Sequence, residues 1–263
     1  MIPRGYIEEW RGSAPWPESF QVEQDLILSR IITDLFNNDF IRSNYAFRGG
    51  TALHKLYLSP QVRYSEDIDL VQIKSGPIKD TLKLINKTLN FIEGKRSVKQ
   101  GGSNNTIIYQ FETEIPPVVS KKIKIEINCR EHFNVFGFKG KNFNCNSSWY
   151  SSEAEVTTYS IEELLSTKLR ALYQRKKGRD LFDLHYALSK TDPDCEKIIY
   201  SFKKYINDSG LQPPSAKEFI INVEKKLRSN EFTGDVYSLL RPGISYDTDT
   251  AYDIVRKKLL EKF

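Results

Sequence analysis

Residues 47–70 read FRGGTALHKLYLSPQVRYSEDIDL, and this stretch decides the fold. We expect residues 45–48 to end a strand, after which Gly49 and Gly50 let the backbone approach an anionic group closely. We expect Thr51 to open a helix whose free N–H groups face the same anion. The stretch therefore predicts a phosphate-binding turn.

A second strand is predicted at residues 67–71, DIDLV. Because side chains alternate along a strand, Asp67 and Asp69 share one face, and Ile68 and Leu70 share the other. Two carboxylates on one face repel each other unless a cation lies between them, and a divalent metal that carries nucleotide phosphates fits this position. The pattern favours a metal–phosphate site. The alternative is an ordinary strand-turn-helix unit with two exposed acids.

The bulk composition sets broad limits. The chain has 263 residues, of which 39% are hydrophobic and 28% are charged, enough for one large domain or two modest ones. No run approaches the roughly 18–20 apolar residues that a membrane span needs, and MIPRGYIEEW lacks the apolar core of a signal peptide. A soluble cytoplasmic protein with no membrane partner is expected. The net charge of +5 is compatible with a nucleic-acid partner but does not require one.

The spacing of cysteine and histidine argues against two classes of small site. Cys129, Cys145 and Cys195 are too unevenly spaced for a disulfide framework or a cysteine-based zinc motif, so free thiols are expected. The three histidines show no spacing typical of metal ligands, so packing or surface positions are expected for them.

The rest of the first half contains alternating helical and extended patterns. The expected elements are an amphipathic structural helix at 18–40, a helix at 77–92 with Pro77 in its first turn, a polar Gly-rich connection at 94–105, strands at 106–111 and 122–128, and loop or irregular strands at 134–158. In the strand at 122–128, Glu126 lies on the polar face, opposite Ile125 and Ile127. Glu126 is therefore a candidate third metal carboxylate.

After residue 158 the chain becomes helical, which places a domain boundary there. Ser160 and Glu163 have the spacing of a capping box before a helix that runs through residue 172. A turn at Gly178 precedes a helix at 180–188, on which Asp180 and Asp183 share a face. Three short helices are expected in residues 194–263.

A basic segment joins the first two of these helices. It holds six cations and no acid, namely Lys168, Arg170, Arg175, Lys176, Lys177 and Arg179. Such a cationic face, followed at once by paired acids, suits binding of a triphosphate or of an RNA backbone. The alternative is that the charges only solvate the end of a helix.

Five fragments, taken in order, resemble the motifs of one known family. GGTALHKLYL, RYSEDIDL, KIEINCR, KLRALYQR and GRDLFDL are similar to motifs of the AbiEii/AbiGii-type nucleotidyltransferase toxins, a branch of the DNA polymerase β-like nucleotidyltransferase superfamily. The resemblance covers about residues 45–188. It implies an α+β fold, with a mixed-sheet catalytic domain and flanking helices over residues 1–158. A helical domain over residues 159–263 is implied to complete the active-site cleft.

The resemblance also implies roles for individual residues. The catalytic residues would be Asp67, Asp69, Lys168, Asp180 and Asp183. The NTP would be bound by Gly49, Gly50, Thr51, Arg63, Ser65, Lys168, Arg175 and Arg179. The metal, Mg²⁺ with Mn²⁺ as the alternative, would be held by Asp67 and Asp69, with Glu126 as the third candidate ligand.

The implied activity is Mg²⁺-dependent transfer of a nucleoside monophosphate from an NTP to RNA. The 3′ end of tRNA is the expected acceptor, so that modification blocks aminoacylation and inhibits translation and growth. A cognate antitoxin protein is the expected partner, in a toxin-antitoxin system of the phage-defence kind. Two alternatives stay open: the acceptor is a protein hydroxyl or a small molecule, or the chain is a non-catalytic module that binds NTP or RNA.

Overall fold

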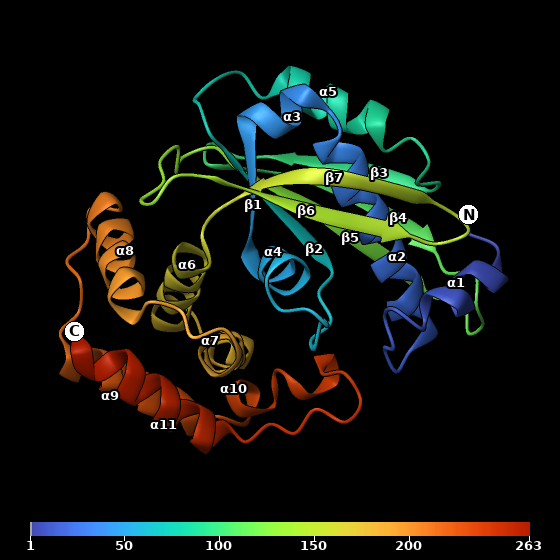
Figure 1. Ribbon diagram of the computed structural model, residues 1–263. Coiled ribbons are helices and arrows are strands. Elements are labelled where there is room, and N and C mark those ends of the chain that lie inside the picture. The colour runs from blue at the N-terminus through green and yellow to red at the C-terminus, as the bar shows by residue number, and fades with distance from the viewer. Residues whose placement is uncertain (1) are drawn as a thin grey trace. The chain divides into compact units, whose positions relative to one another are not determined.

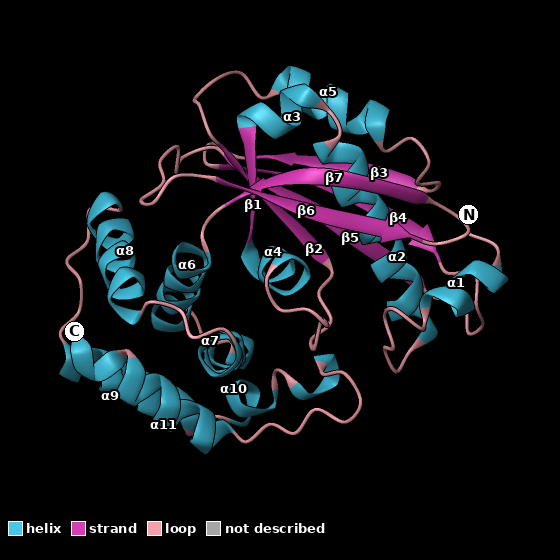
Figure 2. Ribbon diagram, in the orientation of Figure 1, coloured by secondary structure: helices cyan, strands magenta, loops and turns pink. Residues whose placement is uncertain are grey.

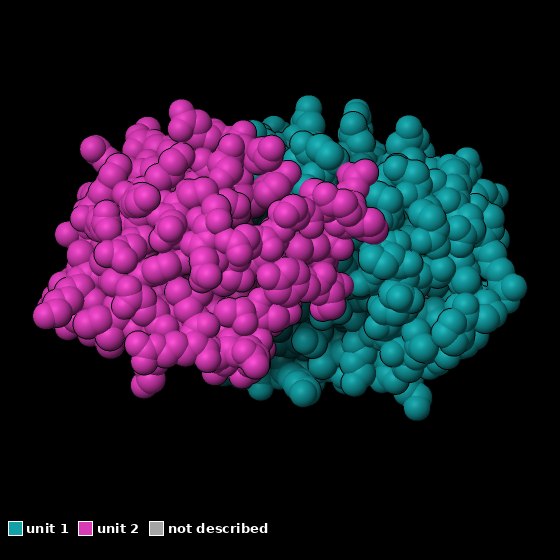
Figure 3. Space-filling view, turned by 90° about the horizontal axis from the view of Figure 1, so that it is seen from below, with its two compact units in different colours: residues 1–134, 138–159 teal, residues 135–137, 160–263 magenta. Residues whose placement is uncertain are grey.

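The computed structural model describes residues 2–263, which form two compact units, coloured separately in Figure 3. Among the described residues, the first unit comprises residues 2–134 and 138–159, and the second comprises residues 135–137 and 160–263. Within the described residues, no helix is both long enough and apolar enough to cross a membrane. Each unit is described separately below.

The first unit is a sheet with helices (Figure 1). Its elements are α1 Arg4–Trp10, α2 Ser19–Phe36, α3 Asp39–Asn44, β1 Tyr45–Arg48, α4 Gly49–Leu56, β2 Asp67–Gln72, α5 Lys79–Thr88, β3 Lys95–Gln100, β4 Asn104–Glu112, β5 Ser120–Asn128, β6 Lys139–Asn146 and β7 Ser151–Thr158. The strand order is β3-β4-β5-β2-β1-β7-β6. The pairs β2/β5 and β1/β7 are parallel and the other pairs are antiparallel, so the sheet is mixed.

Both α2 and α5 pack on the same face of this sheet. The ring of Phe36 at the end of α2 lies 6.2 Å from that of Phe47, and the hydroxyl groups of Tyr45 in β1 and Thr81 in α5 are 2.6 Å apart. Since Tyr45 and Phe47 are two residues apart on β1, their side chains point to one face. On this side, alternate residues of β4 and β5 are buried, namely Asn105, Ile107, Tyr109, Phe111, Ile123, Ile125 and Ile127, whereas those on the opposite face of the two strands are half-buried or exposed. The second face carries the candidate site.

The predicted helix at 18–40 is present as α2, but its description as amphipathic was wrong. Burial covers 14 of its 18 residues, polar ones included. The sheet covers one side, while α1 and α4 cover the other: Trp10 donates to Asp25 at 3.0 Å, and the Lys55 ammonium lies 3.0 Å from the same carboxylate. Because these polar groups are paired, a helix with acids inside remains compatible with the core.

Two predicted irregular stretches are regular strands, so those predictions were wrong. The polar connection predicted at 94–105 contains β3, whose residues are all exposed and which pairs with β4 at the edge of the sheet. The stretch predicted as loop or irregular strands at 134–158 contains the hairpin β6–β7, drawn as two strands in Figure 2. In both cases backbone pairing with a neighbour supplies the order, which apolar periodicity does not reveal.

The helix predicted at 77–92 is shorter in the structure. It is α5, Lys79–Thr88, so Pro77 precedes the helix and does not lie in its first turn. Ile85 and Leu89 are buried, as the periodicity predicts, and Ile92 is buried in the turn that follows.

The second unit is helical. It contains α6 Ile161–Gln174, α7 Gly178–Lys190, α8 Cys195–Asp208, α9 Ala216–Leu227, α10 Asn230–Gly234 and α11 Thr248–Lys258, with short 3₁₀ turns η1 Tyr237–Leu239 and η2 Leu260–Lys262. The three helices predicted in residues 194–263 correspond to α8, α9 and α11, and α10 and η1 are further short elements between α9 and α11. The three cysteines are free, as expected.

The predicted capping box at Ser160 is only half formed. The Ser160 hydroxyl accepts a hydrogen bond from the Glu163 N–H at 3.3 Å, as in a capping box. The Glu163 carboxylate, however, accepts from the N–H groups of Val135 and Phe136 at 2.7 and 3.1 Å, and from the Tyr205 hydroxyl at 2.8 Å. Glu163 thus anchors residues 135–137 to the helical unit, which explains why three residues so early in the chain belong to it.

Candidate active site

The turn between β1 and α4 is formed around Gly49. Gly49 has φ +81°, a left-handed conformation that glycine adopts without strain, and α4 begins at this residue. A Cβ atom at Gly49 would lie 2.0 Å from Oδ2 of Asp69. The Asp69 carboxylate therefore lies directly against the Gly49 backbone, at the start of a helix.

Side-chain hydrogen bonds fasten this helix start to the strand that carries the acids. The Thr51 hydroxyl donates to the backbone carbonyl of Asp67 at 2.5 Å. Since its single proton is used there, Thr51 accepts from the Ser65 hydroxyl, 2.7 Å away. Arg63 is buried and donates from Nη1 to the Tyr64 carbonyl at 2.9 Å. These contacts order the loop before β2, and binding of NTP by Thr51, Ser65 and Arg63 stays a prediction.

The predicted carboxylates lie on one face of two neighbouring strands. In the parallel pair β2/β5, Asp67 is opposite Lys124 and Asp69 is opposite Glu126. Residues in register on adjacent strands point to the same face. Asp67, Asp69 and Glu126 are thus half-buried neighbours on the face opposite Ile68 and its buried partners.

The electrostatics of this face favour a bound cation. Burial, together with the nearby carboxylates of Asp69, Glu66 and Glu126, raises the pKa of Asp67 to about 6, although the ammonium of Lys124 opposes this shift. The Lys124 Nζ atom lies 3.9 Å from Oδ1 of Asp67. An additional positive charge on this face would relieve the repulsion among these carboxylates.

These residues fit a metal that arrives with a nucleotide. Among residues 2–263, no three His, Cys, Asp or Glu side chains converge into a ready-made metal cage. Mg²⁺ does not require one, because it is usually held by one or two carboxylates together with waters and substrate phosphates. The same-face pair Asp67 and Asp69, beside a helix start, has that chemistry. Metal binding by Glu126 stays a prediction.

Arg48 is a charged neighbour of this site that the sequence reading missed. It is opposite Asp69 in the β1/β2 pair, and its guanidinium forms an ion pair with Glu131. Burial lowers the pKa of Arg48, but the interactions with Glu131, Tyr159 and Asp69 outweigh that effect and raise it. The sequence contains a signal for this ion pair, because Arg48 immediately precedes the glycine pair and Glu131 directly follows the KIEINCR fragment.

The predicted residues of the second unit form a separate buried cluster. The Lys168 ammonium lies 3.3 Å from Asp180 and 2.8 Å from Asp183. Arg175 contacts the two carboxylate oxygens of Asp180 through Nε and Nη2, at 2.7 and 2.8 Å. Lys168 and both acids are buried. The shared face predicted for the two acids is confirmed by their common contact with Lys168, while their catalytic role and the cleft between the domains stay predictions.

The basic segment is less cationic than its sequence suggests. Lys176 and Lys177 lie 3.8 and 3.7 Å from Glu231, and Lys177 and Arg179 lie 3.8 and 3.7 Å from Asp235. These acids follow the segment by about fifty residues in the sequence, so no local pattern could reveal them. Binding of NTP by Arg175 and Arg179 stays a prediction.

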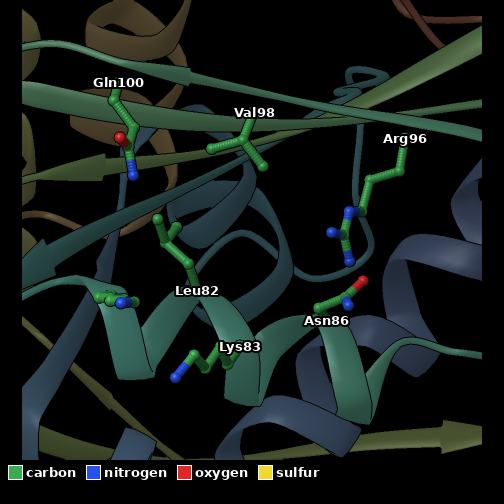
Figure 4. Close-up of a pocket in the computed structure, with 7 residues that line it drawn as sticks. Leu82, Lys83, Asn86, Arg96, Val98 and Gln100 are labelled. Atoms are coloured by element: carbon green, nitrogen blue, oxygen red, sulfur yellow. The ribbon is translucent and has the colours of Figure 1, made fainter.

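A separate open groove lies on the other face of the first unit (Figure 4). It has a volume of about 460 Å³ and is lined by Lys79, Leu82, Lys83, Asn86, Arg96, Val98 and Gln100. It therefore lies between α5 and β3, on the face that α5 covers, away from the candidate carboxylates.

Comparison with known proteins identifies the family. The model of a family described as "Nucleotidyl transferase AbiEii toxin, Type IV TA system" matches residues 30–254. The chain belongs to the AbiEii family. The resemblance seen in the sequence motifs is therefore confirmed, and with it a nucleotidyltransferase of the toxin type, a class of enzyme that takes NTP as substrate.

Solved structures support the AbiEii fold. MenT4, a nucleotidyltransferase toxin from Mycobacterium tuberculosis H37Rv, has a TM-score of 0.67 at 15% identity, covering 100% of this chain and 91% of that one. JHP933 from Helicobacter pylori has a TM-score of 0.60 at 18% identity, covering 93% of each chain. A putative nucleotidyltransferase from H. pylori gives 0.56 at 17% identity, with 93% and 96% covered. The predicted α+β fold, with a mixed sheet and flanking helices, is confirmed. No curated protein sequence matches the chain.

Proposed function

We propose that this AbiEii-family enzyme transfers a nucleoside monophosphate from an NTP to a hydroxyl group of an RNA acceptor, with Mg²⁺ held by Asp67 and Asp69. The observation that carries the proposal is the position of the Asp69 carboxylate against Gly49, beside Asp67 and at the start of α4. A helix start offers free N–H groups to phosphate, and the two acids offer hard oxygen ligands to the metal that accompanies it.

In the proposed reaction a bond forms between the acceptor oxygen and the α-phosphorus, and the bond to the β-phosphate oxygen breaks to release pyrophosphate. The metal, when bound, would lower the pKa of the attacking hydroxyl and neutralise charge on the leaving oxygens. The protein itself contributes by holding the reacting groups in position. Gly49 lets the Asp69 carboxylate lie against the start of α4, and the hydrogen bond from Thr51 to Asp67 holds the helix start against the acids.

For the second unit we propose that Lys168 contacts phosphate, with Asp180 and Asp183 orienting its ammonium. The ion pairs of 3.3 and 2.8 Å support the orienting part of this proposal. Arg175 contacts Asp180 as well, so that this acid is shared between two cations.

The proposed acceptor is the 3′ end of tRNA, modification of which would stop aminoacylation and growth. The family's description as a toxin of a Type IV toxin-antitoxin system supports growth inhibition and a cognate antitoxin partner. Mg²⁺, with Mn²⁺ as the alternative, is the proposed metal.

The test is to incubate the protein with α-labelled NTPs, Mg²⁺ and total tRNA, and to separate RNA, protein and small molecules afterwards. Label on RNA is the expected result, together with its loss in Asp69→Ala and its retention in Glu112→Gln, an exposed acid at the end of β4. Label on protein or on a small molecule would identify a different acceptor. Failure of the protein to bind NTP in the presence of Mg²⁺ would indicate a non-catalytic module.

A further inference from the structure

The edge strand β3 presents its charged residues to both sides of the sheet. Figure 4 shows Arg96, Val98 and Gln100 pointing towards α5 across the groove. Because side chains alternate along a strand, Lys95 and Lys99 point to the opposite face, which is the face of the candidate carboxylates.

The register of the sheet connects these lysines to the acids. One row runs across four strands from Lys99 through Thr106 and Glu126 to Asp69. With strands about 4.8 Å apart, Lys99 lies roughly 15 Å from Asp69 along this row. A second row ends with Lys124 opposite Asp67. The lysines and the proposed metal site therefore share one continuous surface.

This surface is cationic and accessible. Lys95, Lys99 and Lys122 are exposed, and the side chain of Lys124 is 42% exposed. We call these four residues the lysine face. On this side of the described strands β3, β4 and β5, the acidic residues are Glu126 and Glu112, and Glu112 lies at the far end of β4.

Lysine at a sheet edge is also a common device against aggregation, which could explain Lys95 and Lys99 alone. It does not explain Lys122 and Lys124, because β5 is an interior strand, paired with β4 and β2. The two interior lysines extend the positive charge from the edge to the acids, and this continuity points to a ligand.

We propose that the lysine face is the surface on which the acceptor RNA docks, through its phosphodiester backbone. This inference rests on the proposed function, and it specifies how the acceptor reaches Asp67 and Asp69. Four lysines match a polyanion, and each acts as a point charge towards phosphate. The surface leads directly to the proposed metal pair, so an RNA strand bound along it would deliver its end to the acids.

The composition of the surface also indicates how the RNA is recognised. The aromatic residues of β4, Tyr109 and Phe111, are on the buried side of the sheet, and the other side of the described strands β3, β4 and β5 carries no aromatic ring. Base stacking, which sequence-tolerant and sequence-reading RNA surfaces both exploit, therefore has no platform here. Docking depends on backbone charge, tolerates different sequences and weakens with salt.

The test compares Lys95→Gln/Lys99→Gln with Arg96→Gln. All three residues are exposed on the same strand, and Arg96 points to the opposite face, so Arg96→Gln controls for loss of a positive charge from this strand away from the lysine face, with one charge removed against two in the double variant. The probes are a fluorescent single-stranded RNA of about twelve nucleotides for binding without NTP, and total tRNA for transfer. Loss of two phosphate contacts makes the negative slope of log K against log salt shallower by about 1.4. For the double variant we expect this shallower slope and weaker binding at low salt. For Arg96→Gln we expect wild-type values.

The result that overturns the inference is equal RNA binding by wild type and the double variant, or a loss confined to Arg96→Gln. If wild type labels RNA in either of those cases, the proposed function stands and only the docking surface is wrong. If wild type transfers nothing to RNA but binds it, and the double variant loses that binding, the docking surface stands and the proposed function fails. Wild type that binds no RNA at all overturns the docking surface.

Discussion

Replacing Asp67 with asparagine is expected to stabilise the metal-free protein while abolishing nucleotide transfer. The reason is that Asp67 is ionised at neutral pH among other acids on a half-buried face. Burial, reinforced by Asp69, Glu66 and Glu126, raises the pKa of Asp67 from 3.8 to about 6. Ionising this carboxyl group therefore costs more free energy in the folded protein than in the unfolded chain.

The magnitude follows from that shift. About two pKa units correspond to about 3 kcal/mol as an upper limit. The Asp67 side chain is 35% exposed, so solvent screening reduces the expected gain to about 1–2 kcal/mol. For a chain of this size that gain raises the melting temperature by about 3–6 °C.

The pH dependence has a definite sign. Well below pH 3.8 the carboxyl group is protonated in both states, so wild type and Asp67→Asn differ little in stability. As pH rises through the window from 3.8 to about 6, the unfolded state loses its proton first and wild type becomes relatively less stable. The difference in melting temperature should therefore grow from acid to neutral pH and stay constant above it.

The assay is thermal unfolding in a chelator at several pH values, with Glu112→Gln as the control for loss of an exposed carboxylate. Added Mg²⁺ with NTP should then raise the melting temperature of wild type more than that of Asp67→Asn, because a ligand stabilises the form that binds it. An Asp67→Asn protein that is less stable than wild type in chelator at neutral pH would refute this reasoning, since it would mean that the ion pair with Lys124 outweighs the repulsion.

Three further predictions follow from other residues. Gly49→Ala should reduce transfer about a hundredfold, because the new Cβ atom displaces the Asp69 carboxylate. The control is Gly137→Ala, where φ is +77° and a Cβ atom would meet open space, and this variant should lose only about 1 kcal/mol of stability and keep its kcat. Burial raises the pKa of Glu23 to about 7, so the free energy of unfolding should fall as pH rises from 4.5 to 7. In urea unfolding, the free energy of Glu23→Gln should fall by about 2–3 kcal/mol less than that of wild type over this pH range. Lys168→Met should destabilise the protein by about 3–5 kcal/mol, because it removes a positive charge that pairs with two buried carboxylates. Lys190→Met, at an exposed position, should change stability by less than about 0.5 kcal/mol. Equal urea midpoints for the two variants would contradict this prediction.

Local signals explain what the sequence predicted well. The turn at Gly49, the helix that follows and the alternation of Asp67 and Asp69 depend on neighbours within a few residues, and the structure has all three features. Glu126 was placed on the polar side of its strand by the same alternation, and the sheet register then brought it opposite Asp69.

Features that depend on distant partners were missed. β3, KRSVKQ, has no apolar alternation, because both of its faces are exposed and its order comes from pairing with β4. The partners of Lys177 and Arg179 include Asp235, far along the chain. Glu163 was assigned to a capping box from its spacing, but its carboxylate binds residues 135–137, which no local pattern indicates.

The most direct measurement of the central claim is single-turnover transfer of α-labelled nucleotide to RNA by wild type, Asp69→Ala and Asp69→Asn, each checked for folding by circular dichroism. Asp69 lies against the backbone at the start of α4, and its carboxylate is proposed to hold the metal. The account predicts label on RNA with wild type and a loss of about a hundredfold or more with both variants, since both remove a metal ligand. Transfer by folded Asp69→Ala at the wild-type rate would contradict it.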